Sequence, residues 1–520
     1  MRCDVLVVGG GINGCGIARD LAGRGLEVLL VEQDDLAAHT SSASTKLIHG
    51  GLRYLEYYEF SLVRKALAER EVLLRSAPHI MRPLRFVMPH DPSMRPVWMI
   101  RAGLFLYDHL ARREVLPGSR TIDLRRHATG APLKPVFTKG FVYSDASVDD
   151  ARLVVLNAID AAERGATVLT RTRCSQARRG ADGHWTVRLE ARDGAASTVA
   201  ARALVNAAGP WAAQFLHDEA GMAGSKTLRL VKGSHIVVGK LFEHDHAYIF
   251  QNPDGRIIFA IPYEGEFTLI GTTDVEHTGP IGEAHIDAAE TAYLCDQASR
   301  YFARAVQPAD VVWSYSGVRP LLDDESSAAA AVTRDYQLEL DRGESDAPER
   351  PGAPLLSVWG GKITTFRKLA EEAADALCGA LDCASRRGWT EPAYLPGGEL
   401  ASWIGKPRRP DADFARFEAE LRRRHPELPA PLAHRYARCY GTRVERLLDG
   451  GALGAEVAPG LFEAELHYLR DHEWARSADD VLWRRTKLGL HLTPRERDKV
   501  VHWWAAQPAP AASLKEAACS

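Results

Sequence analysis

The chain has 520 residues, of which 46% are hydrophobic and 26% charged, so its composition excludes disordered, collagen-like and disulfide-stapled proteins. A formal net charge of −3 gives no general attraction to nucleic acid or to an anionic membrane, and no nucleic-acid partner is expected. At roughly 100 to 200 residues per domain, a chain of this length predicts about two to four domains.

The eight cysteines are scattered, with neither a C-x-x-C pair nor a His/Cys cluster at zinc spacing. This pattern predicts reduced thiols in an intracellular protein and no metal site. The first residues, MRCDVLVVGGG, lack the basic and long apolar regions of a signal peptide. No apolar run approaches the roughly 18 residues that cross a bilayer. Any membrane contact is therefore expected to be peripheral.

The first elements of the chain form a βαβ unit. A short valine-rich run at 4–8 is typical of a parallel strand that is buried on both faces. The stretch GGGINGCGIARDLAGRG predicts a glycine loop and a helix that ends at Gly25, and EVLLVE at 27–32 is the second strand. Cys15 lies in the glycine loop, where a small side chain is needed, and is expected to pack rather than react.

The glycine loop fits the dinucleotide pattern G-x-G-x-x-G. Gly9 permits the tight turn, Gly11 lets the backbone approach a pyrophosphate, and Gly14 permits close helix packing. Glu32, eighteen residues after Gly14, is placed to accept hydrogen bonds from ribose hydroxyls. The pattern alone does not separate FAD from NAD. The segment ALVNAAGPW at 203–211 resembles the second dinucleotide contact of two-domain flavoproteins, which favours FAD, although an ordinary strand end has the same appearance.

The middle of the chain predicts a helix followed by strands. Residues 149–172 give a helix, a turn at Gly165 and a strand, and 184–192 and 197–209 follow as strands around a D-G turn. Four further β-like runs indicate an antiparallel sheet able to cover a bound ligand. They are 228–239, 247–252, 256–263 and 267–274.

Arginine, leucine and alanine dominate after residues 395–400, which predicts a helical C-terminal domain that ends in a flexible tail at 505–520. A proline-rich surface loop is predicted at 342–354. We therefore predict six segments. They are FAD-binding 1–80, a cap region 81–148 with a membrane-facing helix, FAD-binding 149–225, a substrate-binding sheet 226–340, FAD-binding 341–388 and the helical domain 389–520.

Several segments in one order resemble the FAD-dependent, respiratory glycerol-3-phosphate dehydrogenases, from about residue 4 to about residue 500. Besides the glycine loop, they are TSSASTKLIHGGLRYLE at 40–56, LVKGSHIVV at 230–238, IGTTDVE at 270–276, YSGVRPLLDDES at 315–326, GGKITTFRKLAE at 360–371 and YLRDHEWARSADDVLWRRTKLGL at 468–490.

The resemblance implies the α/β, two-domain FAD-binding Rossmann-like fold of the D-amino-acid-oxidase-like flavoproteins, with an antiparallel-sheet substrate domain and a C-terminal all-helical domain. It implies oxidation of sn-glycerol 3-phosphate to dihydroxyacetone phosphate, with FAD reduced and then reoxidised by membrane quinone. It also implies a homodimer that is peripherally associated with the cytoplasmic face of the inner membrane.

Three cations beside glycine, serine or threonine are the candidates for the substrate phosphate. They are Arg53, Arg319 and Lys362. Small neighbours let a ligand approach, and arginine grips phosphate with paired N–H donors. Lys362 stands in GGKITTF, which also resembles a loop that closes on the flavin, so its amine is expected to face the flavin, the phosphate or both. Tyr54, Thr272 and Thr273 are further substrate candidates, although for the two threonines of GTTD a turn role is equally open.

The implied reaction removes hydride from C2 of the alcohol while a base takes the hydroxyl proton. His49, before a glycine pair, and His235, in a predicted strand, compete for the role of base. The residues alone leave this choice open. The resemblance implies that both histidines and Arg319 are catalytic, whereas Asp274 is interpreted as structural because its charge would repel phosphate.

The serine-rich half of 40–56 is expected to serve the flavin, with hydroxyls on its phosphates or ring edge and Lys46 adding positive charge where a reduced, anionic flavin forms. A solvated loop is the alternative interpretation. The expected cofactor contacts are Gly9, Gly11, Ile12, Asn13, Gly14, Glu32, Ser41, Ser42, Ser44, Thr45, Lys46, Ala207, Gly209, Gly361, Lys362, Ile363 and Thr364.

Residues 94–114 carry apolar side chains at helical spacing with basic groups on another face, as in an interfacial helix, although a helix packed on the core fits as well. Two other functions stay open: a flavin oxidase that uses oxygen, acting on glycerol 3-phosphate or an amino acid, and a flavin-binding subunit without turnover. The several phosphate-binding cations favour the dehydrogenase.

Overall fold

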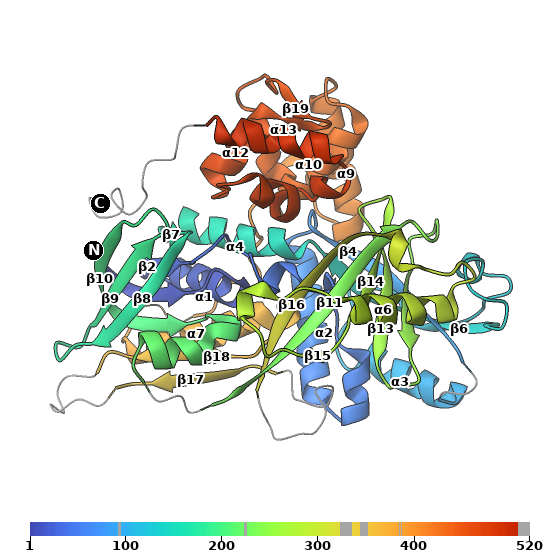
Figure 1. The fold of residues 1–520 in the computed structure, drawn as a ribbon, viewed down its shortest axis with the longest axis horizontal. Helices are drawn as coiled ribbons and strands as arrows, with labels where there is room; N and C mark the ends of the chain where they lie inside the picture. Colours follow the sequence, from blue (N-terminus) through green and yellow to red (C-terminus); the bar gives the residue numbers. More distant parts are fainter. Residues whose placement is uncertain are drawn as a thin grey trace.

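The computed structural model describes residues 1–91, 95–222, 226–322, 335–343, 352–383, 385 and 387–507. Most of the predicted loop 342–354, most of the tail 505–520 and the end of YSGVRPLLDDES lie outside these residues. The described chain forms a dinucleotide-type α/β body, a second sheet beside it, and a helical domain above both in the view of Figure 1.

An eight-stranded sheet forms the dinucleotide-type body, in the order β17-β18-β10-β1-β2-β7, with β9 beside β10 and β8 beside β9. The pairings of β1 with β10 and β2, of β10 with β18 and of β2 with β7 are parallel. The strands are β1 (Arg2–Val8), β2 (Val28–Val31), β7 (Thr167–Leu169), β8 (Thr172–Arg179), β9 (Trp185–Ala191), β10 (Ala196–Asn206), β17 (Gln337–Asp341) and β18 (Leu355–Trp359). The predicted N-terminal βαβ unit is therefore confirmed.

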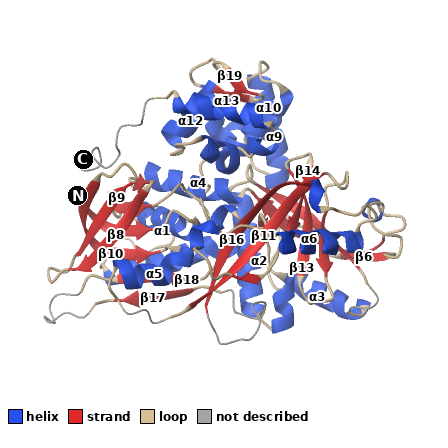
Figure 2. Ribbon diagram, in the orientation of Figure 1, coloured by secondary structure: helices blue, strands red, loops and turns tan. Residues whose placement is uncertain are grey.

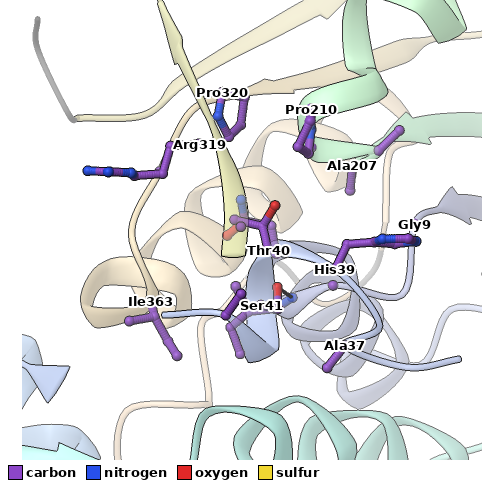
Figure 3. Close-up of a pocket in the computed structure, with 18 of the residues that line it drawn as sticks. Gly9, Ala37, His39, Thr40, Ser41, Ala207, Pro210, Arg319, Pro320 and Ile363 are labelled. Atoms are coloured by element: carbon purple, nitrogen blue, oxygen red, sulfur yellow. Dashed lines mark hydrogen bonds between the residues drawn. The ribbon is translucent and has the colours of Figure 1, made fainter. Parts of the chain in front are cut away.

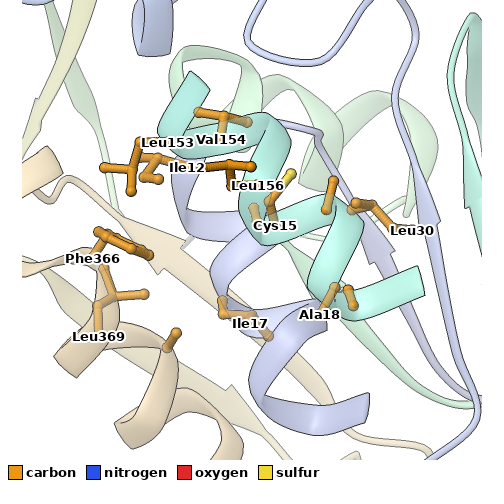
Figure 4. Close-up of a cluster of buried hydrophobic side chains, with 14 of the residues drawn as sticks. Ile12, Cys15, Ile17, Ala18, Leu30, Leu153, Val154, Leu156, Phe366 and Leu369 are labelled. Carbon is orange, nitrogen blue, oxygen red and sulfur yellow. The ribbon is translucent and has the colours of Figure 1, made fainter. Parts of the chain in front are cut away.

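Three helices pack together beside this sheet: α1 (Ile12–Gly23), α4 (Asp150–Glu163) and α7 (Phe366–Ala380). Figure 4 shows side chains of α1 between Leu153 and Leu156 of α4 and Phe366 of α7. Gly16 makes the close approach possible, because a Cβ there would lie 2.9 Å from the ring of Phe366. The Cys15 thiol is fully buried and its pKa is raised by desolvation, as expected of a packing residue.

The second sheet has ten strands in the order β15-β11-β14-β13-β12-β4-β6-β3, with β16 beside β11 and β5 beside β6. The four predicted runs from 228 to 274 are confirmed as β11 (Leu228–Gly239), β12 (Ala247–Gln251), β13 (Ile257–Tyr263) and β14 (Phe267–Gly271). The other strands are β3 (Leu47–Ile48), β4 (Met81–Pro89), β5 (Arg120–Asp123), β6 (Lys139–Val148), β15 (Val275–Glu276) and β16 (Val311–Leu322).

This sheet is not wholly antiparallel, because β12 pairs with β4 in parallel. The two strands are separated by more than 150 residues, so no local turn fixes their relative direction, and hydrophobic alternation carries no information on it. The segment 81–148, predicted as a cap, supplies β4, β5 and β6 to the same sheet. Helix α6 (Ala288–Tyr301) packs on it beside β11, β13 and β14.

The C-terminal domain is helical and has its own hydrophobic core. Its helices are α8 (Ala401–Ile404), α9 (Pro410–Arg424), α10 (Ala430–Tyr440), α11 (Val444–Leu448), α12 (Glu463–His472) and α13 (Pro494–Ala505), with the π-helical turn η10 (Asp480–Arg485). The expectation of an all-helical domain is corrected by a two-stranded ribbon, β19 (Glu456–Ala458) with β20 (Leu461–Phe462), shown in Figure 2. Gly460, at a φ of 72°, turns the chain between these strands.

Helices α2 (Phe60–Ser76) and α3 (Val97–His109) lie below the second sheet in Figure 1. Within the described ranges, none of the helices is both long and apolar enough for a bilayer crossing. The seven cysteines in the same ranges are free thiols.

Candidate active site

A cavity of about 480 Å³ is lined by residues from both large sheets. Its walls come from the glycine loop, the segment 37–49, the end of β10, strands β11 and β16, and the loop before α7. Figure 3 shows how Gly9, Ser41, Ala207, Arg319 and Ile363 surround it from these separate elements. The topology thus brings segments from the whole first two-thirds of the chain to one place.

The glycine loop lies against the end of β10 with no room for side chains. Gly9 has a φ of 111°, and a Cβ there would lie 2.4 Å from the carbonyl oxygen of Ala207. A Cβ on Gly14 would lie 1.9 Å from the carbonyl oxygen of Gly9, so this glycine supports the loop from behind the cavity. The open backbone at the start of α1 is the cradle that a pyrophosphate requires.

Glu32 closes the loop as well as lining the cavity. Its carboxylate accepts from the Gly10 amide at 2.6 Å and from the Asp34 amide at 2.8 Å. Burial of the side chain raises its pKa. The two amide bonds hold the carboxylate in one orientation, with lone pairs left for ribose hydroxyls.

The serine-rich segment is divided between the cavity and the core. Ser41 Oγ accepts from the Ile12 amide at 3.0 Å, at the open start of α1. Thr45 Oγ1 lies 3.0 Å from Nε2 of His235. Thr45, Ser41 and Ser44 line the cavity, and Ser42 does not.

Lys46 does not line the cavity, contrary to the expectation that its charge faces the flavin. Its Nζ donates to both carboxylate oxygens of Asp150, at 2.9 and 3.0 Å, and to the Ser42 carbonyl. Ser44 Oγ donates to the same carboxylate at 2.7 Å. Burial lowers the Lys46 pKa, against the attraction of Asp150. Since Asp150 begins α4, more than a hundred residues away, the local sequence could not reveal this buried pair.

His49 lines the cavity, and a buried network that no sequence motif predicts holds its neighbour in place. The Gly50 amide donates to the Tyr107 hydroxyl at 2.8 Å, and that hydroxyl donates to Asp145 at 2.8 Å. Arg70 Nη1 also donates to Asp145, at 2.6 Å. These groups belong to α2, α3 and β6, so only the folded chain brings them together. Their separation in the sequence left no motif.

His235 has 2% of its surface exposed and stacks on Tyr315 at 4.8 Å between ring centroids. Burial, and then the charges of Lys46 and Arg319, hold the pKa of His235 well below its usual value. Its imidazole is therefore neutral near pH 7. Gly271 of β14 is the cross-strand partner of His235, and a Cβ there would come within 2.1 Å of the ring.

Strands β11 and β16 form one wall of the cavity. They are antiparallel, and their register pairs His235 with Tyr315, Gly233 with Gly317 and Val231 with Arg319. Because cross-strand partners lie on the same face of a sheet, the paired glycines stand between the imidazole and the guanidinium. A Cβ at Gly233 would lie 2.5 Å from Nη2 of Arg319, so glycine is what lets the arginine lie along the strands.

Arg319 lines the cavity and forms an ion pair with Asp274 at 2.6 Å. Its Nη2 also donates to the Thr273 carbonyl at 2.8 Å. The Thr273 side chain itself points away from the cavity: it is buried and its hydroxyl donates to Glu290 at 2.6 Å. The threonine that lines the cavity is its neighbour Thr272. Of the two threonines expected near the substrate, Thr272 thus lines the cavity and Thr273 does not, because successive side chains point in opposite directions.

The two remaining predicted cations differ in position. Lys362 lines the cavity and its Nζ lies 3.6 Å from the ring centroid of Tyr54, which lines it too. Arg53 does not line it, and its Nη2 donates to the Tyr57 hydroxyl at 3.2 Å on the outer side of the turn η2 (Leu52–Tyr57). Of the other expected contacts, Gly11, Ile12, Asn13, Ala207, Gly209, Gly361, Ile363 and Thr364 all line the cavity.

Several lining residues carried no signal in the sequence. His39 packs edge-on against Trp211 at 4.7 Å between centroids, and its Nε2 bonds Asp34 at 2.9 Å. Phe259 of β13 lies edge-on to His49. Trp211 is the exception among these residues, because it belongs to the segment at 203–211 that is predicted as a strand end.

The residues present fit FAD. The side-chain-free loop and the start of α1 suit a pyrophosphate, Glu32 suits a ribose, and the cavity continues past Thr45 and Ile363 to the histidines, which leaves room for a ring system beside them.

Comparison with known proteins agrees with this geometry. Residues 4–365 match the model of the FAD-dependent oxidoreductases, and residues 389–502 match the C-terminal domain of alpha-glycerophosphate oxidase. A solved glycerol-3-phosphate dehydrogenase of Bacillus halodurans, complexed with FAD, is 28% identical and superimposes with a TM-score of 0.76, covering 97% of this chain and 90% of that one.

Curated relatives are more similar in sequence. A glycerol-3-phosphate dehydrogenase of Pseudomonas aeruginosa is 54% identical, over 95% of this chain and 93% of its own length. A D-erythritol 1-phosphate dehydrogenase of Brucella abortus is 51% identical and an aerobic glycerol-3-phosphate dehydrogenase of Escherichia coli 50%, each over 96% of this chain and 97% of its own length. The chain therefore belongs to the FAD-dependent oxidoreductases and carries the C-terminal domain of alpha-glycerophosphate oxidase.

Proposed function

We propose that this chain oxidises sn-glycerol 3-phosphate to dihydroxyacetone phosphate and passes the two electrons to membrane quinone. The main support is an identity of 54% and 50%, over 95% and 96% of the chain, to two glycerol-3-phosphate dehydrogenases. The chemistry of the cavity agrees, since it combines cations, imidazoles and a dinucleotide cradle.

Arg319 and Lys362 bind the phosphate in this proposal. Both line the cavity, and each is oriented by a neighbour, Arg319 by Asp274 and Lys362 by the face of Tyr54. A guanidinium that is already oriented loses little entropy on gripping an anion. Arg53 is a secondary candidate for binding the phosphate, because it stands on a surface turn one residue before Tyr54.

His49 takes the hydroxyl proton as hydride leaves C2. It lines the cavity, and its main chain is bonded through its amide to Thr364 Oγ1 at 3.2 Å. His235 is the weaker candidate, because burial makes its protonated form costly. We assign His235 the role of a neutral hydrogen-bonding partner for the substrate oxygen. Bound FAD supplies the acceptor for the hydride.

A four-carbon polyol phosphate is the second candidate substrate. The D-erythritol 1-phosphate dehydrogenase of Brucella abortus is 51% identical to this chain, as similar as the glycerol-3-phosphate dehydrogenases are. The phosphate-binding and proton-accepting groups serve either substrate, which differ by one CHOH unit.

Anaerobic reduction of the purified holoprotein separates these functions. Glycerol 3-phosphate is expected to bleach the flavin absorbance faster than D-erythritol 1-phosphate, glycerol or an amino acid, with electrons then passing to a soluble quinone. Faster bleaching by the erythritol phosphate would select the second substrate. Rapid peroxide formation in air would identify an oxidase. If none of these compounds bleaches the flavin, the chain is a flavin-binding subunit without turnover.

For the membrane, the support is a group of exposed apolar side chains on α3 and on the stretch from the end of the turn η2 to the first residue of α2. They are Tyr57, Tyr58, Phe60, Trp98, Met99, Phe105 and Leu106. A helix with such a face suits insertion at a lipid surface. We infer peripheral attachment at the cytoplasmic face of the inner membrane, where quinone is available.

The homodimer rests on the family resemblance alone, and sedimentation of the detergent-dispersed protein tests it.

A further inference from the structure

A cluster of buried ion pairs joins the C-terminal domain to the loop after β2, residues 33–39, here called the cradle loop. Asp35 in this loop has 2% of its surface exposed. Arg485 donates to its two carboxylate oxygens at 2.7 and 2.8 Å, and Arg484 Nε donates to Oδ2 at 2.6 Å. Both arginines belong to η10 of the C-terminal domain. The bidentate pair fixes direction as well as distance.

Further buried contacts hold Arg485 in place. Arg485 is fully buried and donates to the Glu473 carbonyl at 2.7 Å. The Glu473 carboxylate forms a buried ion pair with Arg152 of α4. Removal of one member would leave an uncompensated charge in the interior, which is strongly unfavourable. The cluster therefore holds its members in one arrangement.

The cradle loop forms one wall of the dinucleotide site. The Ala37 amide donates to the Gly10 carbonyl at 3.1 Å, and the Asp34 amide donates to Glu32 at 2.8 Å. Ala37 and His39 line the cavity next to the glycine loop. In the chain, Asp35 therefore lies between Asp34 and Ala37, which bond to the wall of the cofactor site. Its own carboxylate bonds to the arginines of the C-terminal domain.

We propose that the C-terminal domain serves to retain the flavin. In this proposal Arg484 and Arg485 hold Asp35, and with it the cradle loop, against the glycine loop. Asp35, Arg484 and Arg485 are positioning residues, because they act on the dinucleotide through the loop. The inference rests on membership of the FAD-dependent family and is independent of which substrate is oxidised.

The test is the affinity of the apoprotein for FAD, measured by the quenching of flavin fluorescence on titration. Arg485→Gln is expected to raise the dissociation constant at least about tenfold, the size of an ordinary coupling between two sites. Arg443→Gln is the matched control. It breaks another ion pair between the C-terminal domain and α4, with Glu163 at 2.6 Å, that does not touch the cradle loop. The control is expected to change the constant less than about twofold.

The pair Asp35→Asn and Arg485→Gln gives a second readout. Because both act on one contact, the double variant is expected to bind FAD about as weakly as the weaker single variant. Hydrogen exchange of the cradle loop 33–39 should also accelerate in each single variant, while exchange in the C-terminal domain outside η10 stays unchanged. Unchanged FAD affinity in Arg485→Gln, an equal loss in Arg443→Gln, or additive effects in the double variant would each overturn the proposal. If Arg485→Gln does not fold, Arg484→Gln, at a position with 18% side-chain exposure, carries the same test.

Discussion

At the scale of single residues, the two histidines of the cavity differ in their surroundings. Burial holds the pKa of His235 well below its usual value, so this imidazole stays neutral across the working pH range. His235→Gln is therefore expected to keep the acidic limb of the pH profile for flavin reduction, whereas His49→Gln is expected to remove that limb and to lower the limiting rate at least about tenfold. Stopped-flow reduction between pH 5.5 and 9 measures both. An acidic limb that survives in His49→Gln would assign the base elsewhere.

The Tyr107 hydroxyl gives a second prediction. Tyr107→Phe leaves the Gly50 amide and Asp145 each without one hydrogen-bond partner, which costs about 1–3 kcal/mol of stability. Because the turn beside His49 loosens, we also expect a lower rate of flavin reduction. Tyr248→Phe is the control, since its buried hydroxyl donates to the Thr129 carbonyl, and neither residue lines the cavity. It should lose similar stability without loss of rate, and equal rate losses would contradict the role of Tyr107.

Which site residues the sequence reveals depends on how local their chemistry is. Gly9, Gly14 and Glu32 follow from one short pattern, because strand, turn and helix are continuous there. For Arg319 the small neighbours give a weak local signal, and the resemblance strengthens it. His235 depends on the resemblance, since an isolated imidazole in a strand has no local signature. The sequence assigns Lys46 to the flavin because its charge suits a reduced, anionic flavin. Its partner Asp150 lies on a distant helix, so no local pattern reveals the buried pair. The network of Tyr107 and Asp145 was missed for the same reason.

At the scale of elements, the packing of the start of α1 against the glycine loop requires that Gly14 has no Cβ. Gly14→Ala would place a Cβ within 1.9 Å of the Gly9 carbonyl oxygen, so helix and loop must separate, at a cost of about 1–3 kcal/mol. The variant is expected to melt at a lower temperature and to be purified with less FAD. Gly103→Ala on α3 is the counterpart, since nothing lies within 4 Å of its Cβ, and it should gain up to about 1 kcal/mol. A Gly14→Ala protein with full flavin content would refute the argument.

Helix α3 presents the prediction for lipid binding. Trp98 and Phe105 are 68% and 59% exposed. Replacement of both by serine is expected to lower partition onto phosphatidylethanolamine–phosphatidylglycerol vesicles about tenfold, since their apolar surface no longer enters the lipid. Val312→Ser, at an exposed position on β16, should leave co-sedimentation unchanged. Equal binding by all three proteins would mean that α3 does not contact lipid.

The elements themselves were largely predictable. Strands β11 to β14 alternate or run apolar between glycine turns, and the chain folds them as expected. The parallel pairing of β4 with β12 and the ribbon of the C-terminal domain were not predictable, because pairing partners and very short strands leave no periodic pattern.

At the scale of the whole molecule, His79 lies buried where the C-terminal domain meets the flavin-binding body. Arg438 donates to its carbonyl, and a Cβ on Gly397 would lie 3.3 Å from its Nε2. Desolvation, together with nearby arginines, lowers its pKa to about 3. The folded chain therefore binds this proton less readily than the unfolded chain does. Stability is fully present above the unfolded pKa and falls as the pH drops, by up to about 1.4 kcal/mol per pH unit.

The corresponding prediction concerns the acid side of the stability profile. His79→Gln removes the titrating group, so its unfolding temperature should fall less steeply than that of the native chain between pH 6 and pH 4. Thermal unfolding at several pH values compares slopes within each protein, which separates this effect from any overall loss of stability. Parallel slopes in the two proteins would show that His79 does not govern acid unfolding.

The fixed register of β11 and β16 has a consequence for the length of the substrate. Arg319 and His235 are attached to one hydrogen-bonded ladder, four residues apart in register, so their backbone separation is about 13 Å. A ladder changes register only in whole steps of about 6.8 Å for side chains on the same face, far more than one carbon–carbon bond. Selection between a three-carbon and a four-carbon phosphate therefore cannot come from gradual adjustment of these strands. Mutational tuning of chain length should therefore act through side chains of other lining segments, such as Tyr54 and Lys362, and not through the spacing of these two strands.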